Sequence, residues 1–317
     1  MKKYSHAWLA FMAIKHLEET KLSTRNRGYA DHLIRWFKDH KDDVIQGAWY
    51  PDAIIKDMAS SHVLKFTPLE DGPKRKWKKL PTNYLLYQLG KTSPVRKKSY
   101  EINRKTNLPD RCESLAHSII DNMKMQQSEE KGSSVAPTGN HVALRLFMLS
   151  HYIADAHMPF HCDSRQFSEG AKIHARVEKH WDDTVKKFYQ IDTDNERFYY
   201  DKHGYPMREP NKSADYKKSF LKKVEDELAG RKFSIGYGNK NKNIWDFMDA
   251  LCQNSYLVSY RFIPEQHDHT TVNRQNWKNL GTIPLEDLSA AVFADAIESI
   301  ARAWFRVWRR YVKWVRR

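Results

Sequence analysis

The stretch from residue 140 to residue 161, Asn140-HVALRLFMLS-His151-YIADAHMPF-His161, carries the clearest helical pattern in the chain. Its apolar residues recur at the spacing of three or four that marks an α-helix, and Asn140 is a typical helix cap. Pro159 cannot continue a helix. We therefore expect a buried helix from Asn140 through Asp155, after which the chain folds back.

Outward from this stretch, nearly every patterned segment also has helical period. Ser5 is a candidate cap for the first helix, residues 42–55 read as loop or short turns, and residues 190–213 read as polar loop. No internal repeat or clean linker is present. The sequence predicts one all-α domain over residues 1–317, with long loops between helices. The expected helices cover residues 5–22, 28–38, 109–127, 140–155, 172–189, 214–229, 243–265 and 285–317.

The composition limits the classes of partner. Hydrophobic residues make up 40% of the 317, which is typical of a folded globular chain. Lys and Arg outnumber Asp and Glu by 54 to 39, and the resulting net charge of +15 favours nucleic acid, anionic lipid surfaces or phosphate-bearing substrates. The three cysteines form no CxxC pair, which disfavours both a thiolate zinc site and a disulfide framework.

The sequence also bears on location. No apolar run approaches the roughly 18 residues that a membrane-spanning helix needs. Residues 7–14 resemble a short signal core, but no small-residue cleavage site follows them and the helical pattern continues. We therefore expect a cytoplasmic protein without a transmembrane segment.

The strongest chemical signal is His151-x3-Asp155-x5-His161. Residues four apart lie on one face of a helix, so the first two side chains project into the same space. The turn at Pro159 lets His161 approach that space. A buried Asp is costly without a partner, and imidazole with carboxylate is a ligand set suited to catalytic zinc, iron or manganese. The pattern predicts a metal centre.

Three further groups of residues are each weak evidence for a metal site. His174-x3-Glu178 could lie on a solvated helix, because basic residues surround Glu178. Asp52 follows a proline and could simply cap a helix, ahead of His62. His6 could be an ordinary histidine at a helix start.

Taken in order, these elements resemble the zinc-dependent phospholipase C family and the related trizinc single-strand nucleases of fungi and plants. The resemblance runs from the first helix to about residue 185. It implies a phosphodiester hydrolase with two or three zinc ions. By this resemblance, Asp52, His62 and His151 hold the first zinc of a close pair; His161, His174 and Glu178 hold a more separate zinc; and Asp155 bridges the close pair, with His6 on its other metal.

The resemblance also implies roles for Met1 and Asp52. In the family, the amine and carbonyl of the mature N-terminal residue, usually a Trp exposed by signal-peptide removal, complete the third site. Here Met1 lies five residues before His6, a spacing similar to that of the nuclease branch, and bulky Lys2 disfavours removal of Met1. We expect Met1 to complete the third site; if only two metals bind, His6 is structural. Asp52 occupies the position of the family's candidate base and is expected to orient water.

The sequence leaves two classes of phosphodiester substrate possible, phospholipids and single-stranded nucleic acids. Glu178 resembles the phospholipase branch, whereas the nuclease branch has Asp there, preceded by Trp; Trp181-Asp182 occurs here at the wrong spacing. We therefore expect hydrolysis of the glycerol-side phosphodiester of a phospholipid. The net charge and the basic loop 74–79, where Trp77 could stack on a base, suit the alternative of single-stranded DNA or RNA.

The last predicted helix leaves a further choice. Its tryptophans and arginines predict either a stripe that faces the core or peripheral contact with an anionic membrane.

A non-enzymatic alternative is a basic protein that binds nucleic acid or membranes and uses metals only to stabilise its fold.

Overall fold

The computed structural model describes residues 1–56, 61–69, 77–91, 99–103, 105, 107–127, 137–165, 172–238, 243–263, 278 and 281–315. These residues are mostly helical, which confirms the all-α prediction. The longer helices are α1 (Lys3–Glu19), α2 (Thr24–Asp39), α5 (Leu108–Gln127), α6 (Gly139–His157), α8 (Ile173–Phe188), α10 (Phe220–Gly230), α11 (Ile244–Phe262) and α12 (Leu285–Val315).

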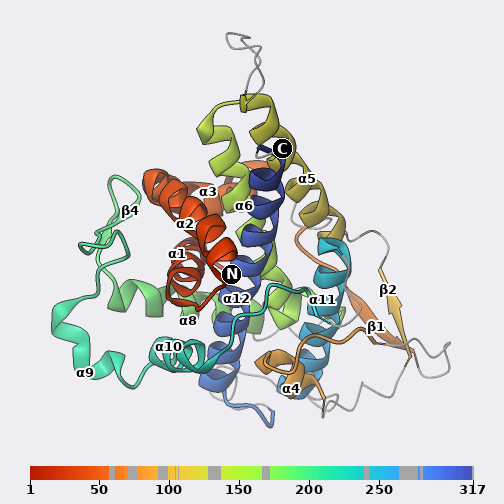
Figure 1. The fold of residues 1–317 in the computed structure, drawn as a ribbon. Coiled ribbons are helices and arrows are strands. Elements are labelled where there is room, and N and C mark those ends of the chain that lie inside the picture. Colours follow the sequence, from red (N-terminus) through yellow and green to blue (C-terminus); the bar gives the residue numbers. More distant parts are fainter. Residues whose placement is uncertain are drawn as a thin grey trace.

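The remaining elements are short. The shorter helices are α3 (Val44–Tyr50), α4 (Leu85–Gly90) and α9 (Ser213–Tyr216), and single helical turns occur at η1 (Lys41–Asp43), η2 (Pro51–Ile55), η4 (Pro159–His161) and η5 (Pro210–Lys212). Two antiparallel pairs of strands, β1 (Phe66–Leu69) with β2 (Ser99–Ile102) and β3 (Ile191–Asp192) with β4 (Arg197–Phe198), lie toward opposite edges of the molecule (Figure 1).

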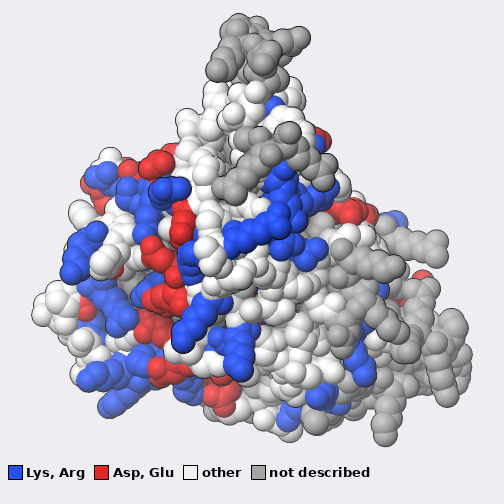
Figure 2. Space-filling view, in the orientation of Figure 1, with Lys and Arg blue, Asp and Glu red and all other residues white. Residues whose placement is uncertain are grey.

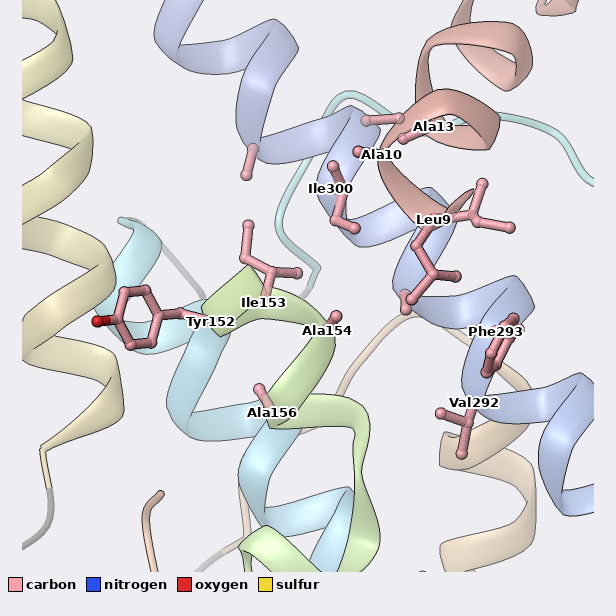
Figure 3. Packing of buried hydrophobic residues seen from close by; sticks show 14 of the residues in the cluster. Leu9, Ala10, Ala13, Tyr152, Ile153, Ala154, Ala156, Val292, Phe293 and Ile300 are labelled. Atoms are coloured by element: carbon pink, nitrogen blue, oxygen red, sulfur yellow. The ribbon is translucent and has the colours of Figure 1, made fainter. Parts of the chain in front are cut away.

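Helix α12 runs through the middle of the molecule, and α1 and α6 pack against it (Figure 1). Small residues on α1 and α6 let the three backbones approach closely, and the larger side chains of α12 fill the space between them (Figure 3). The indole Nε1 of Trp304 on α12 donates to the carbonyl oxygen of Leu146 on α6 at 2.9 Å. The residues at this junction include Ala10, Ala13, Ala154 and Ile300.

The polar side of α12 is also buried, and its charges are paired. Arg302 and Glu298 form an ion pair one turn apart, and Arg231 reaches both Glu298 at 2.9 Å and Asp295 at 2.7 Å. Asp295 in turn accepts hydrogen bonds from the backbone N–H groups at the start of α4, from Leu85 at 3.1 Å and the next residue at 2.7 Å. These contacts connect α12 to α4 and to the chain that leaves α10.

The position of α12 in the middle of the molecule decides whether its apolar stripe faces the core or a membrane. Trp304 and Trp308 are both fully buried, so the apolar stripe faces the core and is not available to a membrane surface. Among the described residues, no helix is long and apolar enough to cross a membrane. Arg316 and Arg317, which belonged to the predicted helix, lie outside the described residues.

The expectation of loop or short turns over residues 42–55 is wrong for residues 44–50, which form a helix, whereas single turns lie on either side at η1 and η2. The segment forms α3 and continues directly into η2, a π-helical turn that ends at Ile55 and is followed by Lys56 with φ 55°. Its buried residues Val44, Ile45, Ala48 and Pro51 fall at helical spacing, which Pro51 obscured because the residue before a proline usually avoids helical geometry. Packing of α3 against α1 and α6 outweighs that local preference.

Three smaller expectations also need correction. Helix α1 begins at Lys3, so Ser5 lies inside the first turn, where its hydroxyl contacts the N-cap residue Lys2. Helix α6 is capped by Thr138, whose hydroxyl accepts from His141 N–H at 3.4 Å, so Asn140 lies within the helix. Residues 190–213, expected as loop, contain the β3–β4 hairpin and η5.

Gly47 allows α3 to lie against α6. A Cβ atom at this position would meet Cδ2 of Phe147 at 2.6 Å, whereas a Cβ at Gly28 on α2 would meet nothing within 4 Å. We expect Gly47→Ala to lower the free energy of unfolding by about 1–3 kcal/mol through overpacking. The matched control Gly28→Ala should raise it by up to about 1 kcal/mol, because Ala is the better helix former. Denaturant unfolding measures both; equal effects would contradict this packing.

Candidate metal centre

The C-terminal end of α6 places three of the predicted ligands. The helix ends at His157 because Met158, which precedes Pro159, is extended at φ −74° and ψ 110°. The turn η4 then reverses the chain and brings Nδ1 of His161 to 3.7 Å from Oδ1 of Asp155. The predicted fold-back after Pro159 is thus confirmed.

The first ligand group consists of Asp52, His62 and His151. Oδ1 of Asp52 lies 3.1 Å from Nε2 of His62 and 3.6 Å from Nε2 of His151. The Nδ1 atom of His151 lies 2.7 Å from the carbonyl oxygen of Ala48 on α3, to which it donates. This hydrogen bond fixes the ring and leaves Nε2 as the acceptor that faces the site.

The second group consists of His161, His174 and Glu178. His174 and Glu178 lie one turn apart on α8, with Nε2 and Oε1 separated by 2.9 Å. Nε2 of His161 approaches both, at 2.9 Å from Nε2 of His174 and 3.4 Å from Oε1 of Glu178. Two ring nitrogens this close either share a hydrogen bond or, with both lone pairs facing inward, could hold one metal ion.

The third group is centred on Asp155. Nε2 of His6 lies 3.5 Å from Oδ1 of Asp155, and Nε2 of His151 lies 3.2 Å from its Oδ2. The rings of His6 and His151 stack with centroids 3.9 Å apart. The amine of Met1 lies 3.1 Å from Oδ1 of Asp155 and 2.7 Å from Oε1 of Glu178. Asp155 therefore joins the three groups into one cluster.

These separations match the size of a metal site. With zinc–ligand bonds of about 2.0–2.1 Å, tetrahedral geometry places two ligand atoms roughly 3.4 Å apart. The pairs in the cluster lie between 2.7 and 3.7 Å, and the ligand atoms of each group lie within 4.8 Å of one another. The structure thus brings together all nine predicted site residues: Met1, His6, Asp52, His62, His151, Asp155, His161, His174 and Glu178.

The charge of the cluster calls for cations. Within the described part of the chain, no Lys or Arg forms an ion pair with Asp52, Asp155 or Glu178. Burial by itself raises the pKa of Asp155 and of Glu178, but the Met1 amine and the neighbouring histidines outweigh it and hold both well below their usual values. The cluster therefore holds two carboxylates, Asp155 and Glu178, that stay ionised beside the Met1 amine.

Two of the histidines, His6 and His161, are in the neutral form that binds metals. Burial lowers the pKa of His6 well below its usual value and that of His161 to about 4, so both rings are neutral. Nε2 of His151, Nδ1 of His161 and Oδ1 of Asp52 are buried and make no hydrogen bond with any described residue. Each such atom costs about 1–3 kcal/mol when left unsatisfied. A metal ion would satisfy these atoms and balance the carboxylates, so the residues fit a metal ion.

The amine of Met1 has a different protonation state. Burial lowers the pKa of this amine, but Asp155 and Glu178 outweigh that effect and raise it to about 11. The amine is therefore an ammonium group between two carboxylates, in the place where a cation is favoured. As a metal ligand it would first release its proton, because ligation uses the nitrogen lone pair.

Asp182 is a residue that the sequence analysis did not assign. Its Oδ1 accepts hydrogen bonds from the backbone N–H groups of Tyr4 at 2.8 Å and Ser5 at 3.1 Å, and Lys186 lies 2.9 Å from its Oδ2. The carboxylate is nearly fully buried. Asp182 thus docks the first turn of α1 onto α8, which positions Met1 and His6. Its spacing, four residues after Glu178 on the same helical face, was the available signal.

The neighbouring Trp181 is structural. It is fully buried, packs against Phe293, and donates from Nε1 to the hydroxyl of Ser289 at 2.7 Å. Asp182 belongs to none of the three ligand groups found among the described residues. Trp181-Asp182 is therefore not a displaced copy of the nuclease-type ligand pair.

Fold and site together define a class of protein: an all-helical chain in which adjoining groups of histidines and carboxylates could hold metal ions. No protein-family model matches the chain, and no curated protein matches it in sequence. The choice within this class therefore depends on the chemistry of the site.

Removal of the Asp182 carboxylate should loosen the N-terminal turn. We expect Asp182→Ala to lower the free energy of unfolding by about 1–3 kcal/mol, because two buried N–H groups lose their acceptor. Amide hydrogen exchange in residues 2–6 should accelerate. The control Asp183→Ala removes an exposed carboxylate whose single ion pair among the described residues is with Lys179, and it should change stability by less than about 0.5 kcal/mol. Equal exchange in the two variants would contradict the docking role.

Proposed function

We propose that this protein is a zinc-dependent phosphodiester hydrolase of the phospholipase C-like kind. The observation that carries the proposal is the position of Asp155, whose two oxygens face His151 on one side and His6, His161 and Met1 on the other. A bridging carboxylate with histidines on both sides suits a cluster of metals rather than a single structural ion.

Each ligand group would hold one metal ion. One zinc would be held by Asp52, His62, His151 and Asp155, and another by His161, His174 and Glu178. A third would be held by His6, Asp155 and the amine and carbonyl of Met1. Zinc suits this set because the ligands are imidazole and carboxylate, with no thiolate among them.

Bound zinc supplies Lewis acidity, which lowers the pKa of a water molecule toward neutrality and offsets the charge of phosphate oxygens. Asp52 would orient that water and accept its proton as well as hold the metal, which is supported by its Oδ1, an atom without a hydrogen bond to any described residue. The side chain of Asp52 is 11% exposed and that of His174 33%, whereas His6 and His151 are fully enclosed. Substrate would therefore approach from the side of Asp52 and His174.

The choice between a phospholipid and a nucleic acid substrate rests on Glu178 and on the packing of Trp77. Glu178, expected in the phospholipase branch, lies in the second ligand group. Trp77 is half-buried, and its ring packs on Tyr100 at 4.2 Å, so this tryptophan contributes to the core. Of the basic residues of this loop, Lys74, Arg75 and Lys76 lie outside the described residues, whereas Lys78 forms an ion pair with Asp249 at 3.2 Å. We propose a phospholipid substrate first and single-stranded nucleic acid second.

Metal content and turnover test the proposal together. The full chain should bind two or three zinc ions by elemental analysis and hydrolyse phosphatidylcholine as well as a generic bis-aryl phosphodiester. Asp52→Asn should reduce turnover at least about 100-fold, since it loses both a proton acceptor and a ligand charge. The control Asp183→Asn should keep wild-type rates.

The other outcomes are distinct. Cleavage of single-stranded DNA or RNA without cleavage of phosphatidylcholine would select the nuclease. Full metal loading with no hydrolysis of any of these substrates would contradict an enzyme and leave metals that stabilise a binding protein. A chain that binds no zinc would contradict the metal centre itself.

The third metal depends on a free amine at Met1. A Gly-Ser extension ahead of Met1 converts the amine to an amide, which removes a ligand and the contacts to Asp155 and Glu178. We expect the extended chain to bind one zinc fewer and to lose about 10- to 100-fold in activity. The same extension at the C-terminus is the control. Full zinc content and activity in the N-terminally extended chain would refute the role of Met1.

A further inference from the structure

A second charged feature lies on the outer side of α12, apart from the metal ligands. Figure 2 shows Lys and Arg side chains gathered over the C-terminal part of this helix. Arg306 and Arg309 are half-buried and Arg310 is exposed, so their charged groups reach the surface while part of each side chain packs against the protein. This gathering follows from the helix itself, because these positions lie beside the buried stripe of Trp304 and Trp308.

The three arginines line a cavity of about 130 Å³. A single water molecule needs only about 10–15 Å³ of such space, so the cavity has room for a small polyatomic anion. Its walls come from α5, α12, the start of α11 and the segment before α11. The lining residues are Glu113, Ala116, His117, Tyr237, Asn243, Ile244, Arg306, Val307, Arg309 and Arg310.

Two of these arginines have no acidic partner in the described part of the chain. Among the described residues, neither Arg309 nor Arg310 forms a hydrogen bond or an ion pair with a carboxylate, and Glu113 is the single acidic residue in the lining. Burial and the neighbouring Arg306 lower the pKa of Arg309, which shows that like charges crowd at this place. Guanidinium groups at close range repel one another unless an anion lies between them.

Arg306 differs because the protein holds it in place. Its guanidinium lies 3.9 Å from the ring centre of Tyr237 and donates to the carbonyl oxygen of Ile235 at 3.2 Å. This fixed wall beside two unpaired guanidinium groups is the arrangement of a prepared anion site, because planar guanidinium groups match phosphate oxygens two at a time.

We propose that this cavity binds the phosphate group of a small ligand. None of its lining residues belongs to the metal cluster, and the proposal does not depend on the proposed hydrolase activity. The shared chemistry is a phosphate dianion, whether free or at the end of a lipid headgroup.

Calorimetric titration of the full chain with inorganic phosphate tests this site. The variant Arg309→Gln/Arg310→Gln leaves Arg306 and its packing in place and should weaken phosphate binding at least tenfold. The control Lys202→Gln/Lys217→Gln removes the same charge from exposed positions outside the lining and should stay within twofold of wild type. Turnover of the bis-aryl phosphodiester should be equal in all three chains, because no metal ligand changes.

Two further binding measurements distinguish the source of the phosphate. One uses vesicles that contain phosphatidate, and the other uses a single-stranded oligonucleotide. Loss of both phosphate and vesicle binding in the arginine variant supports the site and identifies a lipid headgroup as its source. Loss of phosphate binding alone supports a free small ligand. Unchanged phosphate affinity in the arginine variant overturns the proposal. A loss of oligonucleotide binding alone also overturns it, because the arginines would then belong to an extended surface that binds a polymer.

Discussion

The buried carboxylate of Asp155 is the constraint on which the rest of the structure depends. It lies at the end of α6, within the core, and its neighbours come from α1, α6 and η4. An ionised group in that position is tolerated only if its partners are held in place. The packing of α1 and α6 on α12 holds them there, so the apolar core and the polar centre are parts of one arrangement.

Local chemistry explains which parts of this arrangement could be predicted. The apolar spacing of α6, the shared face of His151 and Asp155, and the reversal at Pro159 follow from short-range geometry, and all three are present. The meeting of His6 with Asp155 spans about 150 residues and came only through the family resemblance. Residues 42–55 were misread because a proline suggested a break that tertiary packing overrides.

Helix α12 shows why amphipathic patterns leave alternatives open. Its tryptophan stripe and its arginines are compatible with a membrane surface or with a core, and hydropathy alone does not separate the two. Burial of Trp304 and Trp308 decides for the core, while Arg302 is paired with Glu298 inside the protein. Asp182 is a similar case: its charge and the nearby Lys186 are visible in the sequence, but no side-chain pattern reveals the backbone N–H groups of Tyr4 and Ser5 that it binds.

The contact between Met1 and Glu178 bridges 177 positions of the chain. At a synthesis rate of about 5–20 residues per second, roughly 10 to 35 seconds separate the appearance of these two residues on the ribosome. During that interval α1 has neither a complete α8 nor α12 to pack against, and only α2, α3 and α6 can cover its apolar residues. The centre is therefore a late product of folding, assembled only after more than half of the chain has left the ribosome.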